Sequence, residues 1–206
     1  MSMTGNLKWL YLDFNSYFAT IEQQVKPGLR NKPIVIVPSI TDYTCAIAAS
    51  YEAKKLGIKT GTMIYQAKKL CPKLICIKAD HEKYIYYHHK LIREINKYIP
   101  IEQVCSIDEV ACKLLGKECD PKTIIYKAID IKKGIQRNVG DYISCSIGIS
   151  SNKFLAKTAS NLKKPNGLKI ISTKKILERI NHLKLSDLTR IGKRMETKLF
   201  LSVLHL

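Results

Sequence analysis

The four residues Ser106-Ile107-Asp108-Glu109 place two adjacent carboxylates between two short apolar strand patterns. Because a regular strand points successive side chains to opposite faces, Asp108 and Glu109 cannot share one face of one strand. A turn or strand end between two paired strands would let both carboxylates reach a common point. The stretch therefore predicts two paired strands whose connection carries a candidate site.

A third carboxylate, Asp13, ends the apolar run Leu10-Tyr11-Leu12, which predicts a buried strand over residues 8–13. From a neighbouring strand, Asp13 can join Asp108 and Glu109. Mg²⁺ binds proteins through a few carboxylates plus substrate phosphates. The three acids therefore predict a site for two Mg²⁺ ions, for which Mn²⁺ can substitute, and a phosphoryl transfer. Taken singly, each acid is more typical of an ordinary surface residue at a strand end, and it is the pair between apolar strands that indicates function.

The chain of 206 residues has a formal net charge of +18, which predicts a polyanionic partner, either nucleic acid or an anionic membrane surface. Residues 151–206 carry 13 Lys and Arg against three Asp and Glu, a net +10. A genome rich in A and T would raise the Lys count without concentrating it there. A carboxylate site beside a basic surface favours phosphoryl transfer on nucleic acid.

The cysteine pattern and the apolar runs predict a cytoplasmic protein without a membrane partner. The seven cysteines are an odd number without C-x-x-C spacing, which argues against a disulfide framework or a structural zinc site. The N-terminus lacks a signal-peptide pattern, and no apolar run approaches a membrane span in length. The pair His88-His89 belongs to no H-E-x-x-H motif and is predicted to lie on a solvated helix face.

Apolar runs interleaved with helical patterns predict an α+β fold in which helices cover a sheet. Asn15 or Ser16 is expected to cap the first helix, which ends near Val25. In the helical pattern 81–98, the residues expected to face inward are Ile85, Leu91, Ile92 and Ile95. Further strands are predicted at 34–37, 45–49, 74–77, 142–149 and 168–171, and further helices at 51–56, 63–70, 121–138 and 152–162.

Four groups of residues follow one another in an order and spacing typical of a known family. They are Asp13–Ala19 with Glu22; Ser50–Gly57; Ser106–Glu109; and Ser146–Ser150 followed by Asn152–Lys157 and Lys164–Gly167. From about residue 8 to 172, the chain resembles the Y-family (translesion) DNA polymerases, and the bacterial DNA polymerase IV and UmuC-like branch most. Four motifs in register are far more specific than any one of them.

The resemblance implies a DNA-directed DNA polymerase that acts in DNA repair by bypassing damaged template. Such an enzyme transfers a nucleotide from a dNTP to a primer 3′-OH in a metal-dependent reaction. The implied partners are primer-template DNA and dNTP, together with the sliding clamp or a separately encoded C-terminal domain.

The resemblance also implies roles for individual residues. Asp13 and Asp108 would bridge both metals, Glu109 would bind the catalytic one, and the backbone carbonyl of Phe14 would be a further ligand. Phe18 would be the steric gate that excludes a 2′-hydroxyl, although by its pattern alone it is typical of a core aromatic residue. The remaining implied contacts are Tyr17, Tyr51, Lys54 and Lys164 to the nucleotide, and Lys153, Lys157, Lys193 and Arg194 to DNA.

The implied architecture is a palm with a mixed or antiparallel sheet covered by helices, a small α/β fingers domain and a partial helical thumb. The palm would comprise residues 1–16 and 81–172, the fingers 17–80 and the thumb 173–206, which resembles the start of a helix-hairpin-helix. The family's little-finger domain is expected to be absent, so the chain would be a C-terminally truncated polymerase.

Two residues depart from the family pattern. Family members usually carry Arg where this chain has Lys54, and Lys lacks the fork that matches phosphate geometry, so weaker triphosphate binding is expected. Arg190 stands where the hairpin usually has glycine. Two other functions remain open: a non-catalytic DNA-binding remnant of such a polymerase, and a palm-type nucleotide cyclase. The cyclase would need neither the basic C-terminal segment nor an aromatic gate.

Overall fold

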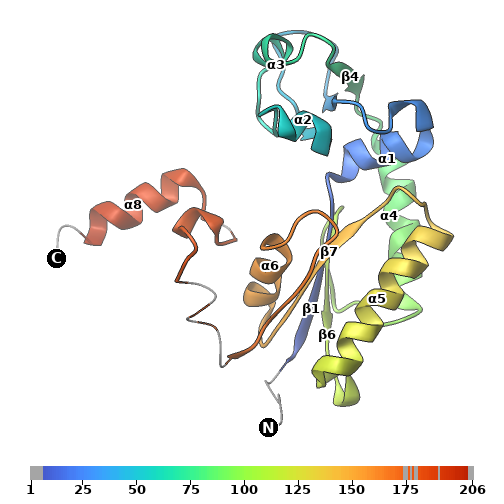
Figure 1. Ribbon diagram of the computed structural model, residues 1–206, viewed down its shortest axis with the longest axis vertical. Helices are drawn as coiled ribbons and strands as arrows, with labels where there is room; N and C mark the ends of the chain where they lie inside the picture. The colour runs from blue at the N-terminus through green and yellow to red at the C-terminus, as the bar shows by residue number, and fades with distance from the viewer. Residues whose placement is uncertain (1–6, 174–175, 177, 179–180, 190, 204–206) are drawn as a thin grey trace.

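Two β-sheets organise the chain, and both are flanked by helices (Figure 1). The structure, a computed structural model, describes residues 7–173, 176, 178, 181–189 and 191–203. The larger sheet has five strands and the smaller sheet has three. This arrangement confirms the α+β fold. No helix among these described residues is long and apolar enough to cross a membrane.

The five-stranded sheet is mixed. Its central strand β1 (Trp9–Phe14) pairs antiparallel with β6 (Glu109–Lys113) on one side and with β7 (Cys145–Ser150) on the other. Strand β5 (Gln103–Ser106) extends the sheet antiparallel beyond β6, and β8 (Leu168–Ile171) extends it parallel beyond β7. The predicted mixed sheet is therefore confirmed.

Helices cover both faces of this sheet. Figure 1 shows α4 (His81–Asn96) and α5 (Pro121–Asn138) on one face and α6 (Lys153–Asn161) on the other. Asn152 caps α6, because its side chain accepts a hydrogen bond from the Leu155 backbone N–H at 2.8 Å. Strand β1 thus lies in the middle layer of the protein.

The alternation of side chains along β1 decides which residues face α6. Leu10 and Leu12 point into the main core, which also contains residues of α4 and α5. Tyr11 packs on the opposite face with Ala111 of β6 and Ala156 of α6. Because Asp13 is two residues beyond Tyr11, its side chain lies on the α6 face.

Gly148 allows α6 to pack directly on the backbone of β7. A Cβ atom at this position would lie 2.0 Å from the Ala156 carbonyl oxygen and 2.3 Å from the Ser160 nitrogen. No rotamer change relieves such a clash, because both atoms belong to the backbone.

Replacing Gly148 with alanine should therefore reduce the free energy of unfolding by about 1–3 kcal/mol or more, the usual effect of overpacking. Urea denaturation followed by circular dichroism measures the change. Gly28→Ala is the matched control, because a Cβ at Gly28 meets nothing within 4 Å. Equal stability of the two variants would show that α6 can shift away from the sheet freely.

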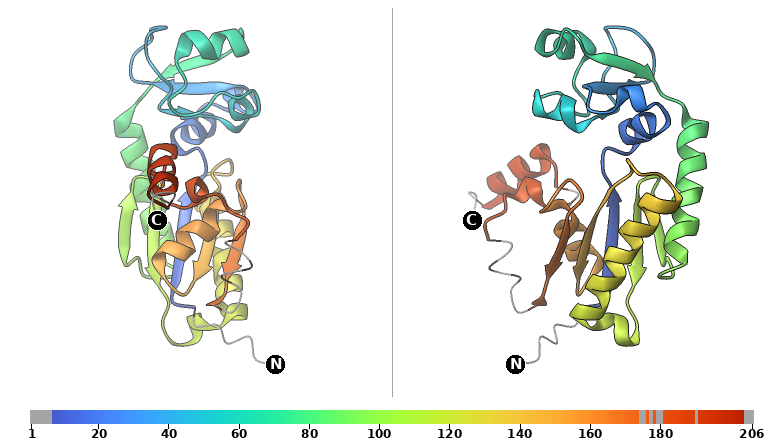
Figure 2. Two further views of the ribbon diagram at one scale, coloured as in Figure 1. Left: turned by 90° about the vertical axis from the view of Figure 1, so that its left-hand side faces the viewer. Right: turned by 45° about the vertical axis from the view of Figure 1, so that its right-hand side comes forward.

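The three-stranded sheet forms a second unit beyond the end of the larger sheet, as the views in Figures 1 and 2 agree. Its order is β3 (Ala48–Ala49), β2 (Ile34–Val37) and β4 (Ile75–Lys78). It has its own apolar core, in which Val35, Val37, Ala53, Ile58 and Ile64 are buried. The helices in this part of the chain are α1 (Tyr17–Val25), the short η1 (Pro27–Leu29), α2 (Tyr51–Lys55) and α3 (Ile64–Leu70).

Three local expectations are wrong. The strand predicted at 45–49 is limited to Ala48–Ala49, with Cys45 joined only by an isolated bridge to Met63. Ile85 is 48% exposed, because Tyr84 instead takes the inward position, seven residues before the buried Leu91. Ser16 precedes α1 with a left-handed φ of 47°, and its side chain makes no capping bond.

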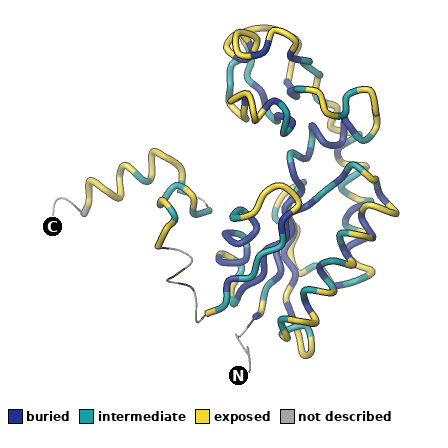
Figure 3. Tube along the Cα trace, viewed as in Figure 1, coloured by how far each residue is buried: buried dark blue, intermediate teal, exposed yellow. Residues whose placement is uncertain are grey.

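The described C-terminal residues include η4 (Leu185–Asp187) and α8 (Lys193–Val203). Glu196 of α8 accepts hydrogen bonds from the Ser186 N–H and hydroxyl, both at 3.0 Å, which join the two elements. Figure 3 shows α8 as largely exposed, in contrast to the buried central strands. Arg190, the departure expected in the hairpin, lies outside the described residues.

Candidate active site

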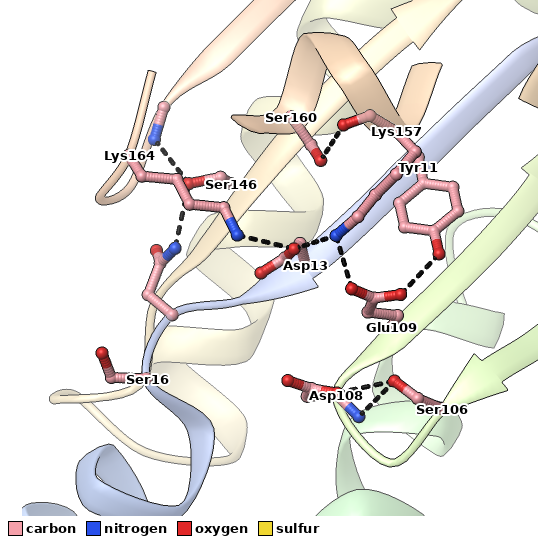
Figure 4. A network of polar contacts seen from close by, with 12 residues as sticks. Tyr11, Asp13, Ser16, Ser106, Asp108, Glu109, Ser146, Lys157, Ser160 and Lys164 are labelled. Carbon is pink, nitrogen blue, oxygen red and sulfur yellow. Dashed lines mark hydrogen bonds and ion pairs between the residues drawn. The ribbon is translucent and has the colours of Figure 1, made fainter. Parts of the chain in front are cut away.

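A carboxylate pair lies where β1 and β6 run side by side, at the end of the sheet nearer the three-stranded unit (Figures 1 and 4). Asp13 and Glu109 are direct partners in the antiparallel register. Only 4% of Asp13 is exposed. Like charges directly opposite each other destabilise a sheet, so this pair requires a cation.

Two lysines supply positive charge to the pair, as Figure 4 shows. The Lys157 ammonium contacts one oxygen of Asp13 and one of Glu109. The Lys164 ammonium lies 2.6 Å from the same Asp13 oxygen, and the Tyr11 hydroxyl donates to Glu109 at 2.7 Å. Burial by itself lowers the pKa of Lys157, but the attraction of Asp13 and Glu109 outweighs it and the pKa rises. Lys157 is therefore held as a cation between the two carboxylates.

Asp108 lies in the two-residue turn between β5 and β6, so the predicted turn is confirmed. Its carboxylate accepts a hydrogen bond from the Ser106 hydroxyl at 2.6 Å, and its backbone carbonyl accepts one from the Phe14 N–H at 2.9 Å. Burial raises the pKa of Asp108, and the charges of Asp13 and Glu109 raise it further, while the Ser106 bond opposes the shift.

The three acids line one cleft but do not converge on one point. Within the described ranges, no group of three His, Cys, Asp or Glu side chains is placed to hold a metal ion. The arrangement has a direct cause. The Lys157 ammonium already donates hydrogen bonds to one oxygen of Asp13 and one oxygen of Glu109. The Asp108 carboxylate instead accepts a hydrogen bond from the Ser106 hydroxyl.

A cleft of about 340 Å³ opens above these carboxylates, between the two sheets. This volume is within the range of small-molecule sites. The larger unit contributes the three acids with Lys157 and Lys164. Phe14 lines it from the end of β1, and Ser16 lines it from the residues between β1 and α1. The smaller unit contributes Tyr17 and Phe18 of α1, together with Ile47, Ala48, Ala49, Lys54 and Thr60. The cleft therefore has acids on its floor and lysines on its walls.

Lys54 reaches across the cleft from α2. Its ammonium donates to the Ser16 hydroxyl at 2.7 Å and lies 4.7 Å from the centre of the Tyr51 ring. Tyr51 therefore supports Lys54 from beneath and is not among the residues that line the cleft. Tyr17 does line it, but its hydroxyl is taken by the backbone carbonyl of Tyr84 at 2.7 Å.

Phe18 is a partly buried wall of the same cleft. Its ring stacks on Tyr84 of α4, with ring centres 4.4 Å apart and an interplanar angle of 18°. His81 meets it edge-on, with ring centres 6.3 Å apart. Tyr84 is fully buried, and its hydroxyl donates to Glu22 at 3.1 Å. The Phe18 ring is thus held from behind by an aromatic residue that is itself fixed.

Asn15 is a structural residue of the site that the sequence pattern identified only as a candidate cap. It is buried, and its side-chain oxygen accepts a hydrogen bond from the Asn166 N–H at 2.8 Å. Its amide group donates to the Ser146 hydroxyl at 3.0 Å. These bonds hold the turn that carries Lys164 against β7. A contact between residues so distant in sequence leaves no local signal.

The four residues predicted to contact DNA lie in two places. On α6, the Lys153 ammonium donates to Gln103 at 2.6 Å, whereas Lys157 points into the carboxylate pair. Lys193 and Arg194 are exposed at the start of α8. The structure therefore brings Lys157 into the site and leaves the other three outside the cleft.

Comparison with known proteins identifies relatives of most of the chain. Residues 12–161 match the model of the impB/mucB/samB family. The chain is 32% identical over 191 residues to DNA polymerase IV of Pelotomaculum thermopropionicum, covering 92% of this chain and 47% of the relative. It is 30% identical over 193 residues to DNA polymerase IV of Saccharolobus solfataricus, covering 92% and 54%. The chain thus spans about half the length of the curated relatives it matches.

Solved structures share the same arrangement. The crystal structure of DinB from Sulfolobus solfataricus superposes with a TM-score of 0.85 at 28% identity, covering 95% of this chain and 57% of that one. The insertion ternary complex of Dbh DNA polymerase superposes with a TM-score of 0.85 at 29% identity, with the same coverage. The likeness extends over 95% of this chain.

Proposed function

Because this chain belongs to the impB/mucB/samB family of Y-family polymerases, we propose that it is a translesion DNA polymerase. The proposed reaction is metal-dependent transfer of a nucleotide from a dNTP to a primer 3′-OH opposite damaged template. The observation that carries the proposal is the opposed pair of Asp13 and Glu109, with Asp108 in the adjoining turn. The relatives named DNA polymerase IV support it.

The chemistry of the site suits divalent cations. Asp13 and Glu109 already share one cation, the Lys157 ammonium, which indicates that the paired oxygens need positive charge. We propose that Asp13, Asp108, Glu109 and the Phe14 carbonyl hold two Mg²⁺ ions, with Mn²⁺ as a substitute. The chemistry such ions supply when bound is a lower pKa for the attacking hydroxyl and neutralisation of phosphate charge.

The lysines and aromatic residues of the cleft then have distinct tasks. Lys54 of the smaller unit and Lys164 of the larger unit, which both line the cleft, would bind the triphosphate, and Tyr51 would orient Lys54 through its ring. Phe18 would lie under the sugar, and Tyr17 would hold the wall beside it. Lys157 would keep the carboxylates neutralised before the substrate arrives.

The domain division proposed from the family is compatible with the two sheets. Residues 1–16 and 81–172 would form the palm, 17–80 the fingers and 173–206 part of the thumb. We propose that primer-template DNA lies along the α6 side of the palm, where Lys153, Lys193 and Arg194 can bind its phosphates. Binding to a sliding clamp or to a separately encoded domain, and a cytoplasmic location, stay predictions.

Primer extension tests the proposed function directly. The purified chain, with a primer-template, dNTPs and Mg²⁺, should lengthen the primer, and EDTA in excess of Mg²⁺ should stop the reaction. Extension should return when Mg²⁺ or Mn²⁺ is added back. A folded chain that binds the primer-template yet adds no nucleotide at high enzyme concentration would contradict the proposal.

A further inference from the structure

His88 of α4 contacts the turn that carries Asp108. Its Nδ1 atom lies 2.8 Å from the Ile107 carbonyl oxygen. The sequence pattern predicted His88 and His89 together on a solvated helix face, which is correct for His89 only. His89 is exposed, whereas His88 is partly buried against the turn.

The contact determines which nitrogen of His88 carries a proton. A carbonyl oxygen only accepts hydrogen bonds, so Nδ1 must be the donor. The bond therefore joins the imidazole to the backbone of the turn without touching a carboxylate. Asparagine can place an amide N–H at nearly the same distance from the main chain, whereas phenylalanine keeps the ring but has no donor.

The two peptide planes that flank the Asp108 Cα atom are both held by distant parts of the chain. On one side, the Ile107 carbonyl accepts from His88 of α4, and on the other, the Asp108 carbonyl accepts from the Phe14 N–H of β1. Fixing both planes fixes the direction in which the Asp108 side chain leaves the backbone.

His88 also belongs to the helix face that supports Phe18. Tyr84, four residues earlier, stacks on the Phe18 ring. Residues four apart lie on one face of a helix, separated by about 6 Å along its axis. One rigid helix face thus contacts both the aromatic wall of the cleft and the turn that carries a carboxylate.

We propose that His88 is a positioning residue, which fixes the turn from which the Asp108 carboxylate projects into the cleft and sets its place relative to Phe18. It acts through the Ile107 carbonyl and touches neither metal nor substrate. This inference rests on the proposed function, because the metal site and the reaction both belong to that proposal. Residues that orient metal ligands from behind typically change metal affinity or activity about 10- to 100-fold when lost.

The test compares His88→Phe with His88→Asn. In His88→Phe, the dissociation constant for Mn²⁺, measured by electron paramagnetic resonance on the protein alone, should rise about 10-fold. Amide hydrogens of residues 106–109 should exchange faster. In primer extension, kcat should fall about 10-fold while KM for dNTP changes less than about twofold, because the triphosphate contacts remain. His88→Asn should restore most of each property.

His89→Phe is the matched control, because it places the same ring on the exposed neighbour, and it should behave as the wild type. Thermal melting of all three variants shows whether they fold. Wild-type exchange rates or wild-type Mn²⁺ affinity in a folded His88→Phe would overturn the inference, as would a wild-type chain that binds no Mn²⁺. A chain that binds Mn²⁺ and responds to His88→Phe, but extends no primer, would instead reject the proposed polymerase activity.

Discussion

Primer extension by the Asp108→Ala variant should be slower than that of the wild type by roughly 1,000-fold or more. Loss of this carboxylate removes a proposed ligand of both metal ions. Metal stabilisation of transition-state charge is worth several kcal/mol, and each 1.36 kcal/mol corresponds to a factor of ten in rate. Single-nucleotide insertion at saturating dNTP and Mg²⁺, followed on a gel, measures the effect.

The folded state should tolerate this substitution well. The pKa of Asp108 is raised by burial and by Asp13 and Glu109, so the fold disfavours its charged form. A carboxyl group whose pKa rises on folding lowers stability at neutral pH. Asp108→Ala should therefore melt at or above the wild-type temperature. Asp130→Ala, at an exposed position of α5, is the control and should retain full activity.

The same variant distinguishes the competing functions. A non-catalytic DNA-binding remnant would bind DNA in a salt-sensitive way that Asp108→Ala leaves unchanged, and neither protein would extend a primer. A nucleotide cyclase would form cyclic product from ATP or GTP alone, and Asp108→Ala would abolish it. Residual extension by Asp108→Ala within tenfold of wild type would show that Asp108 is not a metal ligand of the reaction.

The Phe18→Ala variant should insert ribonucleotides far more readily than the wild type. If the Phe18 ring lies under the sugar, a 2′-hydroxyl collides with it. Steric overlap in a packed environment costs about 1–3 kcal/mol. Because Tyr84 holds the ring in place, the upper part of that range applies, and the ratio of ribonucleotide to deoxynucleotide insertion should rise roughly 30- to 150-fold.

The deoxynucleotide rate of the same preparation is the internal control for folding. It should fall only several-fold, because the carboxylates and lysines are untouched. Tyr126→Ala removes an aromatic ring that is 69% exposed on α5, and it should leave sugar selection unchanged. An unchanged ribonucleotide ratio in an active Phe18→Ala variant would show that Phe18 is only a packing residue.

Local chemistry explains why most helices and strands were predictable. The helix predicted at 121–138 is confirmed with those bounds, because Asp120 caps it, Pro121 suits its first turn and inward residues recur at helical spacing. The errors arose where tertiary contacts prevail over local preference. Tyr84 takes the core position expected of Ile85 because its hydroxyl has a buried partner, Glu22.

The candidate site acids could be identified from the sequence, because carboxylates are the side chains that hard divalent cations prefer. Asp13, Asp108 and Glu109 stand next to apolar strands, and acidic residues are outnumbered in so basic a chain. The residues that contact these acids could not be predicted from residue type and spacing. Lys157 was predicted to contact DNA, yet it lies between Asp13 and Glu109, because α6 packs closely over Gly148.

By itself, the sequence determined most of the elements, the fold class, the candidate acids and the turn that carries Asp108, because each follows from spacing, caps and residue type. Only the tertiary structure decided that Asp13 and Glu109 oppose each other, that Lys157 joins them and that His88 holds the Ile107 carbonyl. The physical reason is the range of the interactions. Periodicity and capping act within a few residues, whereas strand register, helix packing and side-chain bonds join residues dozens of positions apart.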